Sequence, residues 1–414
     1  MRRRTALTVG ATATGLAALS CVAWQFEGDG EDKPERHGWH RPGADDAVTI
    51  NEKLASASAG DEIELPFSSR GYVIATPIRI PSGVALLCDP RSPIRAKVDL
   101  VSMVSLTGPR GRLQGAALES GSVKVTAMVV VDSSAHNVAV DKCDLRAGER
   151  TLIGVRAHGQ QVGTSVTECA IAGPDTAVSF VGSGRGLVVS RTRISRWSQR
   201  GIYFQQRGNR AFVDVTVRGN TVEKLRPGGV SRYPIVVTGT ESQKTRRLEV
   251  GGNMVVGADR SYRDPEFPGT ADQIAVRHAI TVEVSGNKSS DGGDVGITVA
   301  HCRNGEIRDN EVSRNDTAGI YVGTRDGFSM GEILVEGNRC ANNGQNRQGD
   351  RQVHGRAGIR VAEGGRVVLR DNVVVDDQVR PTQLSGVTLD GTPNVRMDGN
   401  DFRGVKTDVV KKRR

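Results

Sequence analysis

The feature that most constrains this chain is an asparagine that returns at the end of similar short segments. It closes VRGN, VSGN, IRDN, VEGN, LRDN and MDGN and, read more loosely, LEVGGN. A second marker, Ile-x-Val or a close variant, usually follows a glycine and lies between successive asparagines. The two series are Asn220, Asn253, Asn287, Asn310, Asn338, Asn372 and Asn400, and Ile202, Ile235, Ile274, Ile297, Ile320, Ile359 and Val387.

The distances between the two markers take only a few values. From each apolar start to the next asparagine they are 13 or 18 residues, and from each asparagine to the next start they are 10, 15 or 21 residues. The shortest complete repeat is therefore 13 plus 10, or 23 residues, and longer repeats differ from it by insertions. Each repeat is too short to bury its own apolar face, so this pattern predicts a stacked solenoid.

Composition and alternation indicate what each repeat contains. Aromatic residues are only 4% of the chain and glycine is abundant at 51 residues, which favours short strands and tight turns over an aromatic-rich globular core. In the segment 297–299, Ile and Val should point inward and Thr outward. The asparagine suits a left-handed turn, and its amide can hydrogen-bond to the asparagine of the next coil.

The same register extends toward the N-terminus and places Thr192, Cys169 and Cys143 at the asparagine position. We therefore expect the two cysteines to be buried turn residues in neighbouring coils. Five cysteines follow Cys21, and none forms a CxxC pair, which argues against a zinc site or a dense disulfide framework. A single disulfide stays possible at this stage.

The start of the repeat region carries a further pattern. Residues 51–57 predict a short helix over the open end of the solenoid, and GDEIELP and YVIATPIRIPSGVALLCDP follow as alternating strands with Pro/Gly turns. This order resembles the pectate-lyase-like superfamily over about residues 47–405. The resemblance implies an all-β, right-handed parallel β-helix with an N-terminal cap helix. That superfamily includes lyases, hydrolases, epimerases, transferases and non-enzymatic tailspikes and adhesins, so the resemblance leaves the reaction open.

The two ends of the chain have a different composition. Arg2-Arg3-Arg4 and an apolar stretch too short for a stable membrane span predict an export signal over 1–23, and the arginine pair resembles the twin-arginine type. We expect a flexible linker over 24–45, the β-helix over 46–405 and a basic tail over 406–414. The protein is expected to be secreted, with a lipid anchor at Cys21 as the alternative.

The net charge of +9 lies partly at these ends. The body is only mildly basic, which fits a solvated surface and also suits an acidic polymer as a ligand. The basic residues are dispersed, so we expect no nucleic-acid partner. A monomer that acts on a polysaccharide, without a cofactor, is the expectation.

Two long connections, 254–273 and 339–358, flank the two shortest coils and predict the walls of a cleft. Ordinary variation in loop length is the alternative. The residues expected to bind substrate there are Tyr262, Arg263, His354, Arg356 and Glu363.

Polar residues in matching register predict the catalytic groups between these walls. His278 and His301 follow their strand starts by four residues, and Tyr321 and Arg360 follow theirs by one. A polysaccharide lyase or epimerase needs a cation for the substrate carboxylate and a base for the proton beside it. Arginine could supply the cation, and histidine or tyrosine could supply the base.

Asp291 and Asp294 precede the strand at Ile297 and offer the two carboxylates that a glycoside hydrolase needs. Together with Arg360 they resemble part of the polygalacturonase pattern, although the histidine and the Asn-Thr-Asp motif of that family are absent here. Both aspartates could instead form turns or ligate Ca²⁺. The sequence thus predicts a secreted polysaccharide lyase or glycoside hydrolase, with a non-catalytic glycan-binding or cell-surface scaffold protein as the alternative.

Overall fold

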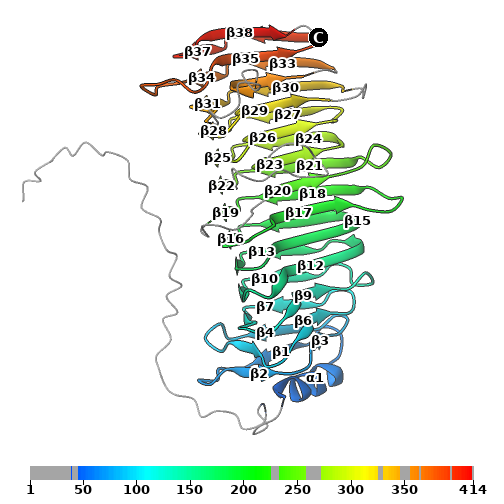
Figure 1. Ribbon diagram of the computed structural model, residues 1–414. Helices are drawn as coiled ribbons and strands as arrows, with labels where there is room; N and C mark the ends of the chain where they lie inside the picture. Colours follow the sequence, from blue (N-terminus) through cyan, green and yellow to red (C-terminus); the bar gives the residue numbers. More distant parts are fainter. Residues whose placement is uncertain are drawn as a thin grey trace, which may run out of the picture. The chain divides into compact units, whose positions relative to one another are not determined.

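The computed structural model describes residue 39 and residues 45–224, 233–257, 272–324, 330–345, 355–362, 365–391 and 394–412. These residues belong to one compact unit, Arg36–Arg414. Helix α1 (Asp46–Ser56) comes first, and strands β1 to β38 follow it in a continuous stack (Figure 1). All recorded strand pairs are parallel, so the described part of the chain is a parallel β-helix, as predicted.

Each coil contributes a strand to three faces, which we call A, B and C. Face A contains the strand of each coil that carries the Ile-x-Val marker or its equivalent. Its strands are β3 (Ile78–Ile80), β6 (Leu100–Leu106), β9 (Val125–Val131), β12 (Thr151–Val162), β15 (Thr176–Ser190), β17 (Arg200–Gln206), β20 (Tyr233–Thr238), β23 (Ile274–Arg277), β26 (Ile297–Ala300), β29 (Ile320–Gly323), β32 (Ala357–Val361), β35 (Ser385–Asp390) and β38 (Thr407–Lys412).

Face B precedes the asparagine turn. Its strands are β1 (Glu62–Leu65), β4 (Ala85–Cys88), β7 (Arg112–Gln114), β10 (Ala139–Asp141), β13 (Ser165–Thr167), β18 (Phe212–Arg218), β21 (Thr245–Gly251), β24 (Ala279–Ser285), β27 (Gly305–Arg308), β30 (Glu332–Glu336), β33 (Arg366–Arg370) and β36 (Asn394–Asp398). The long strand β15 pairs with β17 and then with β18, so faces A and B form one 25-stranded sheet.

Face C is a separate 13-stranded sheet of three-residue strands. It consists of β2 (Tyr72–Ile74), β5 (Ile94–Ala96), β8 (Ala117–Glu119), β11 (Asp144–Arg146), β14 (Ala170–Ala172), β16 (Arg193–Ser195), β19 (Thr221–Glu223), β22 (Met254–Val256), β25 (Lys288–Ser290), β28 (Glu311–Ser313), β31 (Arg339–Ala341), β34 (Val373–Val375) and β37 (Asp401–Arg403).

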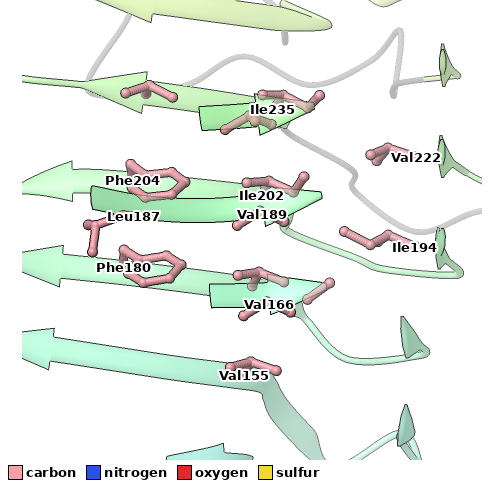
Figure 2. Close-up of a cluster of buried hydrophobic side chains, with 14 of the residues drawn as sticks. Val155, Val166, Phe180, Leu187, Val189, Ile194, Ile202, Phe204, Val222 and Ile235 are labelled. Atoms are coloured by element: carbon pink, nitrogen blue, oxygen red, sulfur yellow. The ribbon is translucent and has the colours of Figure 1, made fainter. Parts of the chain in front are cut away.

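The predicted register of face A is confirmed. Ile202 pairs with Ile235, Ile235 with Ile274 and so on without a slip as far as Val387. These side chains point inward and meet those of faces B and C in a buried core (Figure 2). Phe180 and Phe204 stack there at 4.6 Å, with Phe212 edge-on to Phe204. The core is therefore a column of like residues.

The predicted asparagine ladder is also confirmed at the corner between faces B and C. Each side-chain amide donates to the side-chain oxygen of the next asparagine, at 2.8–2.9 Å from Asn220 through to Asn400. The ladder continues backward, since the backbone N–H of Thr192 donates to Asn220 at 3.0 Å. Cys169 and Cys143 occupy the preceding positions, and both are buried, as expected.

One part of the ladder prediction is wrong. The asparagines themselves do not adopt the left-handed conformation. The residue directly before each of them adopts it instead. Gly286 has φ 62° and Asp309 has φ 54°, ahead of Asn287 and Asn310. The asparagine instead turns inward, where its amide is shielded from water. All five cysteines of the described residues are free and buried, so no disulfide occurs among them.

Helix α1 covers the N-terminal end of the stack, as expected, but it begins at Asp46 rather than near Asn51. Asp45 caps it by accepting a hydrogen bond from the N–H of Ala47, and its buried residues Ile50 and Leu54 join the core. Within the segment expected to be a linker, Trp39 is buried and lies 4.3 Å from the ammonium of Lys53. Strand β38 lies within the segment expected to be a tail and pairs with β35. The segment predicted to be an export signal, which includes Cys21, lies outside the described residues.

Candidate functional site

The outward-facing residues of face A form the predicted column. Ala275 pairs with Thr298, Thr298 with Tyr321, and Tyr321 with Arg360, on four successive coils. The guanidinium of Arg360 lies 5.6 Å from the Tyr321 ring and donates to Asp390 at 2.6 Å. Arg360 therefore already has a carboxylate partner in β35.

His278 and His301 lie at the corner where face A turns into face B. Both residues have a left-handed backbone, with φ 53° and 57°. Their rings stack with centroids 4.6 Å apart and planes 8° apart, so the structure brings these two predicted residues together. Burial first, and then His301, Lys244 and Arg277, lower the pKa of His278 from 6.5 to about 4. His278 is therefore neutral at neutral pH.

Asp291 and Asp294 lie at the other edge of face A, before strand β26, whereas His301 follows that strand. The four residues of β26 alone span about 13 Å, so the aspartates and His301 do not share a site. Asp291 forms a two-pronged ion pair with Arg314 at 2.8 Å, and Asp294 accepts a hydrogen bond from Thr317 at 2.6 Å. These contacts match the interpretation of both aspartates as turn residues.

Five residues were expected to bind substrate at the cleft walls. Tyr262, Arg263, His354 and Glu363 lie outside the described residues. Arg356 is described, and its Nε donates to the carbonyl of Thr382 at 2.8 Å.

A cavity of about 350 Å³ opens beside His278 on face A, over β17, β20 and β23. Two tyrosines, two arginines and an acidic residue line it together with His278; they are Tyr203, Tyr233, Arg200, Arg277 and Glu241. We call this cavity the face A pocket. The Arg200 guanidinium lies 4.2 Å from the Tyr203 ring. The pocket thus joins aromatic surface, cationic groups and a neutral imidazole.

The cationic Arg277 of this pocket forms an ion pair that is shielded from solvent. Arg277 donates to Asp272 at 3.0 Å, and their side chains are only 16% and 7% exposed. Burial raises the pKa of Asp272 above its ordinary value, although Arg277 opposes this. Burial works against the charge of Arg277, but Asp272 and Tyr233 outweigh it and raise the pKa of the guanidinium. Arg277 therefore stays a cation.

The sequence interpretation missed Tyr233, Asp272 and Arg277. Tyr233 and Asp272 each precede a strand start, Ile235 and Ile274, by two residues, and Arg277 directly precedes His278. Inspecting the position two residues before each strand start and the position three residues after it would have found them.

A second hollow, of about 720 Å³, lies on face B and is rich in carboxylates. Four of these five carboxylates already have cationic partners, and the fifth, Glu283, accepts a hydrogen bond from the Ser285 hydroxyl at 2.9 Å. The pairs are Asp214 with Arg185 and Arg247, Glu249 with Arg218, Glu306 with Arg308, and Glu332 with Arg366. Such exposed pairs contribute little energy and leave less charge for a ligand.

Among the described residues, no group of three or more His, Cys, Asp or Glu side chains is arranged to hold a metal ion. The described part of the chain also contains no helix that is long and apolar enough to cross a membrane.

Comparison with solved structures supports the fold. The A-module of Azotobacter vinelandii mannuronan C-5 epimerase AlgE6 aligns with a TM-score of 0.56 and 14% identity, over 89% of this chain and 92% of that one. The catalytic unit of a Streptomyces thermodiastaticus GH87 α-1,3-glucanase aligns with a TM-score of 0.53 and 13% identity, over 88% and 67%. The N-terminal fragment of bacteriophage Phi29 gene product 12 aligns with a TM-score of 0.54 and 12% identity, over 88% of this chain and 69% of that one.

Among curated proteins, none matches the sequence. The family described as "Right handed beta helix region" matches residues 152–348 and 266–402. These two stretches together cover more than half of the 414 residues, and the parallel pairing of every coil agrees with them. The chain therefore belongs to the right-handed β-helix family.

Proposed function

We propose that this protein acts on an acidic polysaccharide by removing a proton beside a sugar carboxylate, as a lyase or an epimerase does. The observation that carries this proposal is the neutral His278 beside the cationic Arg277 in the face A pocket. A base that is unprotonated at neutral pH and a cation that is held in place are the two groups that this chemistry requires.

The reaction assigns one role to each group. The sugar carboxylate approaches Arg277, which stabilises the negative charge that develops when the neighbouring carbon loses its proton. His278 takes that proton. The electron pair moves into the carboxylate-derived enolate. The pair then returns in one of two ways: it expels the oxygen at the next carbon, which Tyr233 protonates, or it accepts a proton that Tyr233 donates on the opposite face of the ring.

The comparisons support a carbohydrate substrate. Two of the similar folds carry the titles mannuronan C-5 epimerase and α-1,3-glucanase. Proton abstraction is better supported than hydrolysis, because Asp291 and Asp294 are engaged by Arg314 and Thr317 at the far edge of face A. Export through the predicted signal would bring the protein to such polymers outside the cell.

Glycan binding without catalysis is the second candidate, and the Asp272–Arg277 pair favours it. A guanidinium that already has a carboxylate partner can orient a sugar without taking part in a reaction.

The test incubates the purified protein with a panel of uronate-containing and neutral polysaccharides. Ultraviolet absorbance detects unsaturated lyase products, proton NMR detects epimerised residues, and a reducing-end assay detects hydrolysis. We expect activity on uronate polymers, and a loss of kcat/KM of about 10² to 10⁴ in His278→Ala. His158→Ala is the matched control, since His158 is a half-buried histidine of the same face in β12.

Release of reducing ends without unsaturated product would contradict the proposal and indicate a hydrolase. Binding without any product, unchanged in His278→Ala, would establish the binding-only alternative.

A further inference from the structure

The sequence of coils places a second imidazole directly against His278. We propose that His301 is a positioning residue for His278, which it holds in one plane by stacking so that the ring faces the face A pocket in its neutral form. This inference rests on the proposed function, because His278 is the base in that reaction. His301 itself does not line the pocket.

The geometry fixes this contact. The two histidines follow strands β23 and β26, which pair from Ile274–Ile297 to Arg277–Ala300. The backbone N–H of His278 donates to the Ala300 carbonyl at 3.0 Å, which seats the two turns in register. Both residues adopt the same left-handed conformation, so their side chains leave the backbone in the same direction. The parallel rings at 4.6 Å follow from this repetition.

The column changes character on both sides of the pair. The preceding coil has Gly239 at this position, where a Cβ would lie 2.4 Å from the His278 carbonyl oxygen, so the close approach of the two backbones excludes a side chain. The following coil has Thr324, which is buried. Among the described residues, the ring that supports His278 is therefore His301, from the next coil along the chain.

The charges around His278 oppose a second positive charge at this corner. Lys244 and Arg277 both act against protonation of His278, as does His301. Glu241 and Arg200, which line the same pocket, and Asp272, which pairs with Arg277, are the other charged groups nearby. Because His301 contributes to this balance, its removal changes the titration of His278 as well as its orientation.

The experiment separates the ring from its charge. His301→Phe retains a stacked ring without a titratable group, and His301→Ala removes both. Histidine-selective ¹³C labelling reports the titration of His278 by NMR without substrate, with His278→Phe to assign its signal among the seven histidines. Thr324→Ala is the control at the next position of the column.

We expect the midpoint of His278 to rise above about 4 in both His301 variants, without reaching 6.5 because burial is the largest cause of its lowered pKa, and to stay unchanged in Thr324→Ala. In the activity assay, the acidic limb of the kcat/KM profile should shift with it. His301→Ala should lose about tenfold in kcat at neutral pH with little change in KM, and His301→Phe should recover most of that loss.

The outcomes distinguish the two proposals. If His278 titrates identically with and without His301, the positioning role is overturned, whether or not the protein is active. If the midpoint shifts but no polysaccharide is converted, the contact between the two rings stands and the proposed reaction falls. Equal loss of kcat in His301→Phe and His301→Ala would show that the charge, and not the stacked ring, matters.

Discussion

Two corners of the same coils follow opposite rules. At the corner between faces B and C, seven successive coils place an asparagine in one column, and each amide bonds to the next. At the corner between faces A and B, the corresponding column changes from Gly239 to His278, His301 and Thr324. The first corner holds the coils together, and the second forms part of a pocket. In this solenoid, the proposed site lies where the repetition of the column stops.

The sharpest test of this contrast is Asn310→Ala. The side chain of Asn310 donates to Asn338 and to the Val284 carbonyl, and it accepts from Asn287. Its removal leaves several buried polar groups unpaired, so we expect a loss of about 3–5 kcal/mol in the free energy of unfolding. Denaturant unfolding followed by circular dichroism measures it.

Asn304→Ala is the matched control for that experiment, because Asn304 is exposed on the adjacent turn. We expect a change within about 0.5 kcal/mol. Similar losses in both variants would contradict the special role of the ladder.

Gly296→Ala tests whether the third corner, between faces C and A, is equally constrained. A Cβ on Gly296 would lie 2.2 Å from a methyl group of Val312 and 2.8 Å from the carbonyl of Gly319. Overpacking of this kind costs about 1–3 kcal/mol. Gly111→Ala, whose Cβ would first meet a flexible Leu106 methyl at 3.3 Å, should cost less in the same unfolding experiment.

The pH dependence of stability should reveal the histidine corner. His278 titrates at about 4 in the folded protein and near 6.5 when unfolded, so the unfolded chain binds more protons between these values. The stability contributed here is present above pH 6.5 and declines as the pH falls toward 4. We expect about 1 kcal/mol, after allowing for the partial exposure of the ring.

The measurement compares thermal unfolding of the wild type and His278→Phe across this range. The difference in melting temperature between the two proteins should become smaller as the pH falls, because only the wild type has a histidine at this position whose pKa changes on unfolding. Parallel curves would show that folding does not lower the pKa of His278.

The smallest effect is expected for Asp291→Asn. It breaks an ion pair with Arg314 that is partly exposed, so stability should change by less than about 1 kcal/mol. Activity should be retained, because Asp291 lies at the far edge of face A. A large loss of turnover in this variant would restore the hydrolase hypothesis.

The sequence predicted the coil length, the inward residues and the asparagine column, because these are set by spacing that each coil repeats. It also predicted the contact between His278 and His301, which follows from the same register. It placed the left-handed residue one position too late, since the backbone requirement falls on Gly or Asp before the asparagine.

The remaining pocket residues were harder to predict for a physical reason. Tyr233 and Asp272 lie where long connections rejoin face A, so each of them directly follows an insertion, and these insertions differ in length. Spacing carries no information there. The ion pair of Asp272 with Arg277 also depends on how deeply both side chains are buried, and the alignment of the repeats does not show burial.

The asparagine ladder has a direction, and that direction bears on how the chain assembles. Asn220 supplies the oxygen that Thr192 requires, while its own N–H groups wait for the oxygen of Asn253. The asparagine of each coil thus accepts the hydrogen bonds of the preceding coil, and its own N–H groups need an acceptor from the following coil. If the coils form in the order in which the chain is synthesised, the last coil formed has two unsatisfied N–H groups on its asparagine, one from the backbone and one from the side chain.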